Sequence, residues 1–381
     1  MFQNSNKMAG IYIHIPFCKS RCIYCAFYST TLLTQRQQYV EALCTEIATS
    51  DKRRAAGTDI STIYLGGGTP SQLTTTQLQQ VFEAIYQHFN VTPDAEITIE
   101  ANPDDVTEEW AKGLALLPVN RVSMGAQTFD DKRLRWLHRR HTASQVAMAV
   151  ERLRQWGINN ISIDLMYGFP AETLQDWERD IDAALALNVE HLSAYCLMVE
   201  EGSELFRRIE TGAERFELSE ETERKMYERL IDRLTEGGYE HYEISNFARK
   251  GYRSRHNSSY WNDTPYIGIG AAAHSYDGRR RMWNVADLSE YIRRTQEGLS
   301  ATEDSEEITG WTRYNDRVTV ALRTREGLDL RQLTEEERQY CKTTARRFLD
   351  DGLLQLEDHH LHLTRRGLFV SDMVMSELMN V

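Results

Sequence analysis

Short runs rich in β-branched residues alternate, over the first half of the chain, with longer segments in which apolar residues recur at helical spacing. Apolar positions 78, 81, 82, 85 and 89 follow one helix face, and residues 146–153 repeat that spacing. The runs themselves occupy residues 11–15, 62–65, 96–100, 121–123, 161–164 and 191–195. This alternation predicts βαβ units and a parallel sheet. Six units are fewer than the eight of a closed barrel, so we expect an α/β fold with a partial (β/α)6 barrel over residues 1–200. A doubly wound sheet is the alternative.

The second half of the chain is less regular and predicts two further regions. Residues 201–300, with a charged helix at 219–235 and a polar, aromatic loop at 256–261, are expected to complete the barrel. Residues 301–381 predict a C-terminal winged-helix-like α+β domain, because a helix at 335–350 precedes two short strands and a final amphipathic helix. This last region holds 11 Lys and Arg against 16 Asp and Glu, which argues against DNA reading. We expect it to pack against the barrel or a partner.

Composition narrows the class of protein further. The 381 residues carry a net charge of −13, so nucleic acid is not an expected partner. No segment approaches the roughly 18 consecutive apolar residues that a membrane span needs. Residues 1–10 are polar and lack the apolar core of a signal peptide. We therefore expect a cytoplasmic protein.

Three of the six cysteines, Cys18, Cys22 and Cys25, lie at C-x₃-C-x₂-C spacing directly after the first predicted strand. Clustered thiols in a reducing compartment indicate a metal rather than disulfides. A zinc ion with His14 as a distant fourth ligand is one interpretation. The other is a [4Fe–4S] cluster with three protein ligands and one open iron, which the flanking aromatic residues favour because they exclude water. The remaining cysteines, 44, 196 and 341, are expected to be buried thiols.

Unusual residues stand at the downstream ends of the other predicted strands, the edge that forms the reactive face of parallel α/β folds. The segment Gly66-Gly-Gly-Thr-Pro70 follows the second strand and allows close approach of backbone to a ligand. Polar side chains follow at the next three strands: Glu100, Gln127 and Asp164. Together with Arg139, which suits a carboxylate, they could hold an amino group, a carboxylate and a ribose diol. An amino-acid-bearing nucleoside presents those groups.

The segment Tyr12-Ile-His-Ile-Pro-Phe-Cys18-Lys-Ser-Arg-Cys22-Ile-Tyr-Cys25, with the Gly-Gly-Gly-Thr-Pro run, resembles the radical S-adenosylmethionine (SAM) proteins. More narrowly, the chain resembles the oxygen-independent coproporphyrinogen dehydrogenases and the HemW-type heme chaperones. The matching motifs extend to Glu100-Ala-Asn-Pro, Asn120-Arg-Val-Ser-Met-Gly-Ala-Gln127, Asp164-Leu-Met-Tyr-Gly-Phe-Pro170, Glu243-Ile-Ser-Asn-Phe247 and Gly268-Ile-Gly-Ala-Ala-Ala-His274. The resemblance implies a [4Fe–4S] cluster on the three cysteines. It also implies SAM contacts at Tyr12, Tyr24, Gly67, Gly68, Thr69, Glu100, Gln127, Arg139 and Asp164.

Three features favour the chaperone branch of this group. The dehydrogenases carry a further cysteine two positions after the third, where this chain has Phe27. They also have a longer segment before the first strand. Finally, His256-Asn-Ser-Ser-Tyr-Trp261 matches the H-N-x-x-Y-W motif of the chaperones, which is associated with heme. An imidazole is an ordinary heme ligand, and the aromatic residues can pack on the macrocycle. His256 is therefore the expected heme ligand, and His274 is a second, weaker candidate.

The resemblance therefore predicts a heme chaperone that binds the cluster, SAM and heme. Its expected partners are heme-accepting apoproteins, respiratory and membrane-associated ones among them, and an electron donor for the cluster. The rival prediction is an enzyme, the oxygen-independent coproporphyrinogen III oxidase, which acts through a 5′-deoxyadenosyl radical in porphyrin biosynthesis. The oligomeric state is not predicted.

Overall fold

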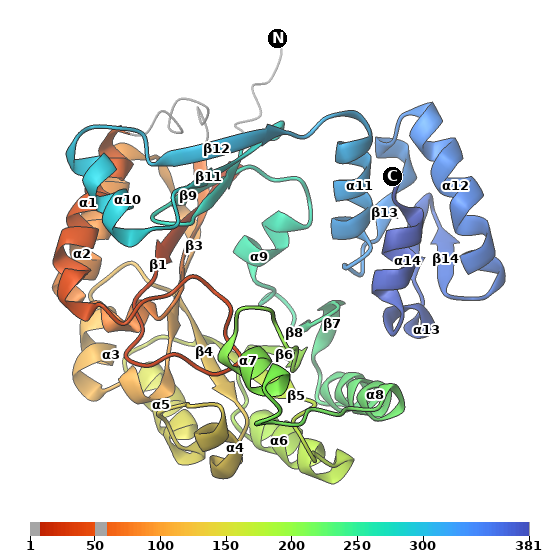
Figure 1. Ribbon diagram of the computed structural model, residues 1–381, viewed down its shortest axis with the longest axis horizontal. Helices are drawn as coiled ribbons and strands as arrows, with labels where there is room; N and C mark the ends of the chain where they lie inside the picture. Colours follow the sequence, from red (N-terminus) through yellow and green to blue (C-terminus); the bar gives the residue numbers. More distant parts are fainter. Residues whose placement is uncertain (1–7, 50–58, 381) are drawn as a thin grey trace.

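The computed structural model describes residues 8–49 and 59–380, and its largest element is a mixed, twelve-stranded sheet (Figure 1). Its centre consists of the six predicted strands, each hydrogen-bonded in parallel to the next. These are β1 (Met8–Ile15), β2 (Asp59–Gly67), β3 (Val91–Ala101), β4 (Arg121–Gln127), β5 (Asn160–Tyr167) and β6 (His191–Cys196). The helices pack around the outside (Figure 1). The predicted partial (β/α)6 barrel is confirmed.

Four of the six barrel helices, α2, α3, α5 and α6, begin at threonine caps, whereas α4 begins at an aspartate cap, Asp130. At α2, Thr74 accepts a hydrogen bond from the Gln77 backbone while the Gln77 side chain accepts one from Thr74, which satisfies two otherwise unpaired amides. The barrel helices are α1 (Arg36–Thr49), α2 (Thr75–His88), α3 (Glu108–Leu114), α4 (Asp131–Trp136), α5 (Ala143–Gln155) and α6 (Leu174–Ala186). Short 3₁₀ helices are η1 (Leu33–Gln35), η3 (Pro70–Gln72), η4 (Pro103–Asp105) and η5 (Leu330–Gln332), the last in the C-terminal part.

Side chains alternate across each strand and so separate an apolar outer core from a polar barrel interior. In β1, Ile11, Ile13 and Ile15 are fully buried in the main apolar core. The intervening Tyr12 belongs to the other face, where its ring stacks on Tyr64 of β2. The alternation therefore directs polar and aromatic groups toward the barrel axis.

Residues 201–307 extend the sheet at both ends. Strand β8 pairs antiparallel with β6 and is followed in the sheet by β7, whereas β9 pairs in parallel with β1 and continues into β10, β11 and β12. Within the described residues, β12 and β7 are the two ends of the order, so the barrel stays open. The elements are α7 (Glu204–Glu210), α8 (Glu220–Glu236), β7 (Glu240–Glu243), β8 (Asn246–Ala248), α9 (Arg255–Tyr260), β9 (Tyr266–Ile269), β10 (His274–Tyr276), β11 (Arg280–Asn284), α10 (Leu288–Gln296) and β12 (Thr302–Glu307). Strand β12 lies beyond residue 301 and yet belongs to the large sheet.

The C-terminal part has its own apolar core and a three-stranded sheet of order β13-β15-β14. Its elements are α11 (Gly310–Ala321), β13 (Leu328–Asp329), α12 (Glu335–Asp350), β14 (Leu354–Glu357), β15 (His360–Leu363), α13 (Arg365–Leu368) and α14 (Ser371–Leu378). The helix, two strands and final helix predicted from the sequence are all present, which confirms the winged-helix-like expectation.

A backbone seam joins this part to the end of the barrel sheet. The Ile244 amide donates to the Arg323 carbonyl at 3.0 Å, and the Arg325 amide donates to the Tyr242 carbonyl at 3.0 Å. Beside these bonds, the Arg323 guanidinium pairs with the Glu243 carboxylate, whose side chain is only 1% exposed. The Glu243 motif noted in the sequence therefore anchors the C-terminal part to the barrel. No helix in the described ranges is both long and apolar enough to cross a bilayer.

Candidate functional site

The glycine run after β2 lies against the cysteine loop and against Glu100. The Gly68 amide donates to the Ile15 carbonyl at 2.8 Å, and the Gly67 amide donates to Glu100 Oε2 at 3.1 Å. Gly67 adopts φ +111°, a conformation that favours glycine. A Cβ on Gly68 would lie 2.7 Å from the Pro16 backbone. The run therefore needs glycine at Gly67 because of its backbone conformation and at Gly68 because the Ile15–Pro16 backbone approaches it closely.

Two carboxyl groups lie on neighbouring parts of the barrel: Glu100 is next to the last residue of β3, whereas Asp164 lies within β5 and not, as the sequence had suggested, at its end, because β5 continues to Tyr167. Glu100 accepts hydrogen bonds from the Tyr64 hydroxyl at 2.7 Å and from Gly67, yet burial, reinforced by the charge of Asp164, raises its pKa to about 7. Burial likewise raises the pKa of Asp164 to about 6, although Ser193 and Ser123 donate to it. These two carboxyl groups therefore offer oxygens that can accept hydrogen bonds from amino or hydroxyl groups of a ligand.

Arg139 connects the edge formed by the strand ends to the cysteines. Its Nη1 lies 3.7 Å from Cys22 Sγ, and its Nη2 donates to Asn102 Oδ1 at 2.7 Å and to the Gly125 carbonyl. Its Nε is buried and has no hydrogen-bond partner among the described residues. Gln127 ends β4 with φ +68°, which turns the chain at the same edge. An unpaired buried guanidinium N–H suits an incoming carboxylate.

The three clustered thiols lie on the loop after β1, close to these groups. Cys18 Sγ is 3.3 Å from Thr69 Oγ1, and burial raises the pKa of the Cys18 and Cys25 thiols. The Tyr24 hydroxyl is buried beside Cys22 and Arg139, and this burial raises its pKa. The glycine run, the polar residues of the strands and the cysteine loop therefore meet at one edge of the barrel sheet.

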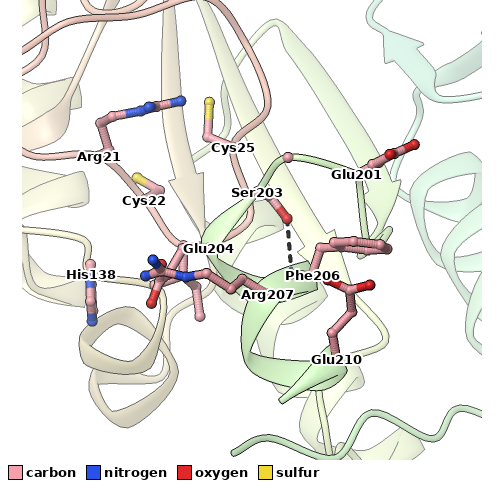
Figure 2. A pocket seen from close by; sticks show the side chains of 12 residues that line it. Arg21, Cys22, Cys25, His138, Glu201, Ser203, Glu204, Phe206, Arg207 and Glu210 are labelled. Carbon is pink, nitrogen blue, oxygen red and sulfur yellow. Dashed lines mark hydrogen bonds and ion pairs between the residues drawn. The ribbon is translucent and has the colours of Figure 1, made fainter. Parts of the chain in front are cut away.

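A cavity of about 770 Å³ opens on the outer side of the cysteine loop (Figure 2). Cys22 and Cys25 line it from the loop, and α7 lines it from the other side, capped by Ser203, which accepts from the Phe206 amide. Its polar lining is Arg21, His138, Glu201, Glu204, Arg207 and Glu210. The loop is therefore accessible from solvent on this side.

The geometry does not suit a single zinc ion. Among residues 8–49 and 59–380, no three His, Cys, Asp or Glu side chains gather around one point that could hold a metal ion. His14, the fourth ligand of the zinc interpretation, has Nδ1 3.0 Å from the Tyr12 hydroxyl and Nε2 3.1 Å from the Tyr28 carbonyl. All six cysteines are free thiols. The free thiols of Cys18, Cys22 and Cys25 are the donors that this loop offers to a metal group.

His256, the motif histidine, points into the barrel from α9. Its side chain is fully buried, with Nδ1 2.8 Å from Thr62 Oγ1 and Nε2 3.0 Å from the Tyr260 hydroxyl. It stacks on Tyr64 with 5.1 Å between ring centroids, and burial, with repulsion from Arg121, lowers its pKa to about 3. Ligation of heme iron by His256 stays a prediction, and in this arrangement it requires one of these hydrogen bonds to break.

The other motif aromatics and the second candidate histidine lie elsewhere. Tyr260 packs edge-on against Tyr266, whereas Trp261 lies at the surface of the barrel facing the C-terminal part, with the Arg323 guanidinium 5.1 Å from its ring centroid. His274 is exposed on β10 and stacks on Trp283. The structure therefore separates the motif into an inward histidine and an outward tryptophan.

Sequence reasoning missed two interior residues, Tyr64 and Arg121. Tyr64 hydrogen-bonds Glu100 and stacks on His256, so it links the strand edge to α9. Arg121 is 1% exposed, and its Nε and Nη1 have no partners among the described residues. The signal was the alternation itself, because positions 62, 64 and 66 and positions 121, 123 and 125 share inward faces.

Comparison with known proteins agrees with this geometry. Residues 12–184 match the radical SAM superfamily, and residues 308–370 match the HemN C-terminal domain. The chain is 35% identical over 374 residues to the heme chaperone HemW of Bacillus subtilis (strain 168). This alignment covers 96% of this chain and 98% of the relative. It is 34% identical over 267 residues to the heme chaperone HemW of Escherichia coli (strain K12), covering 70% and 69%.

A solved structure supports the same fold. The coproporphyrinogen III oxidase HemN from Escherichia coli, a radical SAM enzyme, superposes with a TM-score of 0.84 at 22% identity and covers 98% of this chain and 90% of its own. The chain is therefore a member of the radical SAM superfamily. Within that superfamily it belongs to the HemW-like group, as its motifs predicted.

Proposed function

We propose that the chain is a radical SAM-type heme chaperone that delivers heme to respiratory heme proteins. The observation that carries the proposal is the cysteine loop, where three thiols are followed by Phe27, which is 71% exposed, at the position of the dehydrogenases' fourth cysteine. Relatives named as heme chaperones along nearly the whole chain support it.

We place a [4Fe–4S] cluster on Cys18, Cys22 and Cys25. Thr69 and Arg139 hold polar hydrogens near Cys18 and Cys22, and hydrogen bonds to thiolate sulfur tune the potential of such clusters. When bound, the cluster supplies single electrons and leaves one iron open for the amino and carboxylate groups of SAM. The cavity of about 770 Å³ beside Cys22 and Cys25 leaves room for an electron donor to approach.

We place SAM along the strand edge beside that cluster. The unpaired Arg139 Nε would receive the methionine carboxylate, and the Glu100 and Asp164 carboxyl groups would accept from the amino group and the ribose hydroxyls. Gly67, Gly68 and Thr69 form the loop that would bring backbone close to the ligand, and Gln127 would close the site at the end of β4. Tyr12 and Tyr24 would form the aromatic walls of this site.

In this proposal heme is cargo, and the recipients are apoproteins, membrane-associated respiratory ones among them. We propose that the chain acts in the cytoplasm. The rival activity, oxidative decarboxylation of coproporphyrinogen III, shares the cluster and SAM residues. The exposed Phe27 favours the carrier over this enzyme.

One anaerobic experiment separates the two. The reconstituted full chain would receive coproporphyrinogen III, SAM and a reductant, and a parallel sample loaded with hemin would be mixed with an apo-cytochrome. Transfer of the Soret absorbance to the cytochrome without protoporphyrinogen formation is the expected result. Turnover of the porphyrinogen would contradict the chaperone assignment.

The cluster assignment has its own test in the same preparation. Cys22→Ala should abolish the brown chromophore, whereas the matched Cys44→Ala on α1 should keep it. Full iron stoichiometry in Cys22→Ala would refute the three-thiolate site.

A further inference from the structure

A cavity of about 330 Å³ lies between the end of α9 and the C-terminal part. The motif contributes Ser258 and Trp261 to its wall, and the loop that follows contributes Asn262 and Asp263. From the other side come α11, β13 and one residue of β15, His360. Figure 1 shows α9 on the side of the barrel that faces α11. The outward half of the heme-associated motif therefore forms part of an interdomain cavity.

His360 differs from His256 in having one ring nitrogen with no recorded partner within hydrogen-bond distance, whereas both ring nitrogens of His256 have partners. Its Nδ1 lies 3.1 Å from the Asp358 carbonyl, and because a carbonyl only accepts, this nitrogen carries the proton. In the neutral ring, Nε2 then holds the lone pair, and it lies 3.9 Å from Asp329 Oδ2, beyond a hydrogen bond. A backbone carbonyl that fixes the histidine tautomer in this way is the usual support of a metal-ligating imidazole.

The rest of the lining combines an apolar patch, which can contact a flat ring, with a larger number of polar and charged side chains. Trp261, Val320, Ala321 and Leu328 supply apolar surface. Arg317 also lines the cavity, and its Nε is buried with no partner among the described residues, although its Nη1 donates to the Gln332 carbonyl. An unpaired buried N–H of this kind suits a carboxylate.

The carboxylates in the wall are already neutralised by arginines. Asp263 pairs with Arg313 at 2.8 Å and lies 3.6 Å from Arg317 Nη2, Glu326 pairs with Arg253 at 2.7 Å, and Asp329 pairs with Arg331 at 2.9 Å. The cavity therefore does not present an unbalanced negative field to an anionic ligand.

We propose that this interdomain cavity holds the heme cargo, with His360 Nε2 rather than His256 as the axial ligand and with Trp261 packed against the macrocycle. The inference rests on the proposed heme-carrier function and deepens it. His256 then acts as a positioning residue, because its bonds to Thr62 and Tyr260 fix α9 and hence the place of Trp261. The volume is near the lower end of the roughly 300–1,000 Å³ of small-molecule sites, so the macrocycle would be only partly enclosed. Partial enclosure suits a carrier that must release its cargo.

The test is a hemin titration of the full-length chain, followed by the Soret band and by electron paramagnetic resonance of the ferric state. His360→Ala should weaken hemin binding about tenfold or more and remove the histidine-ligated spectrum. Free imidazole should restore that spectrum in His360→Ala, an effect that loss of structure alone would not give. His359→Asn, in the adjacent turn where φ is +71°, is the matched control and should bind as the wild type does.

Two further variants separate the possible ligands. Ala321→Phe should block the cavity and weaken hemin binding while SAM binding stays unchanged. His256→Gln should keep a histidine-ligated spectrum, with a lower thermal midpoint. If His360→Ala and Ala321→Phe bind hemin normally and His256→Gln loses the ligand spectrum, the inference is overturned and the proposed function stands. If the wild-type chain binds no hemin at all, the proposed function fails and the inference fails with it.

Discussion

Ionisation of Glu100 should destabilise the folded chain as the pH rises, and Glu100→Gln should remove that effect. The pKa of this carboxyl is about 7 in the folded chain against an ordinary value of 4.5, because burial penalises its charged form. At 1.36 kcal/mol per pH unit, this difference corresponds to about 3.4 kcal/mol. The side chain is partly accessible at the barrel mouth, so solvent screening reduces the expected effect to about 2 kcal/mol.

The sign follows from proton linkage. The folded chain holds its proton on Glu100 more tightly than the unfolded chain does, so the stabilisation is complete below pH 4.5 and is lost as the pH rises to about 7. Above pH 7 the wild type carries the full penalty. The free energy of unfolding of Glu100→Gln relative to the wild type should therefore increase by about 2 kcal/mol between pH 4 and pH 8, with most of the increase above pH 5.

Urea unfolding of the metal-free chain at a series of pH values measures this difference. Tyr64→Phe provides a graded comparison, because it removes a hydrogen bond that lowers the pKa of Glu100 while keeping the carboxyl group. In that variant the pH-dependent loss should extend to higher pH. A difference between wild type and Glu100→Gln that stays constant from pH 5 to pH 8 would refute the burial of a protonated carboxyl at this edge.

Three more perturbations test other parts of the site. Gly68→Ala should displace the cysteine loop, because its Cβ would lie 2.7 Å from the Pro16 backbone, and reconstituted iron per chain should fall; full iron content would contradict the close packing. Arg139→Lys should weaken SAM binding in anaerobic calorimetry by roughly tenfold to a hundredfold, since an ammonium cannot replace a guanidinium fork worth about 1.5–3 kcal/mol. Unchanged affinity would remove Arg139 from the site. Arg323→Ala, compared with Arg347→Ala on α12, should lower the free energy of unfolding by about 1–3 kcal/mol and speed proteolytic release of the C-terminal part, because the buried Glu243 loses its cation. Equal proteolysis of the two variants would show that the seam does not depend on this ion pair.

Much of the fold could be predicted from local patterns. The alternation of β-branched runs with helical segments predicted all six central strands. The helix predicted at residues 335–350 corresponds to α12. Local periodicity succeeds here because each strand and helix must present an apolar face to the same core. The pairing of β12 with β11 was not predictable in this way, because β12 is mostly exposed and polar and its partner lies across a helix.

The candidate site shows the same difference between what local sequence patterns predict and what tertiary packing decides. The sequence by itself predicted that the glycine run, Glu100 and Gln127 lie near the cysteine loop, since the carboxyl ends of parallel strands converge at one edge. It also determined that three thiols, and no fourth at Phe27, lie on one loop. Only the tertiary structure decided the direction of each side chain: His256 turns inward because Thr62 and Tyr260 hold both of its nitrogens, and Trp261 turns outward. The contact between residues 62 and 256, and the cavity that residues 261 and 360 both line, depend on the packing of elements far apart in the chain, and local pattern carries no information about them.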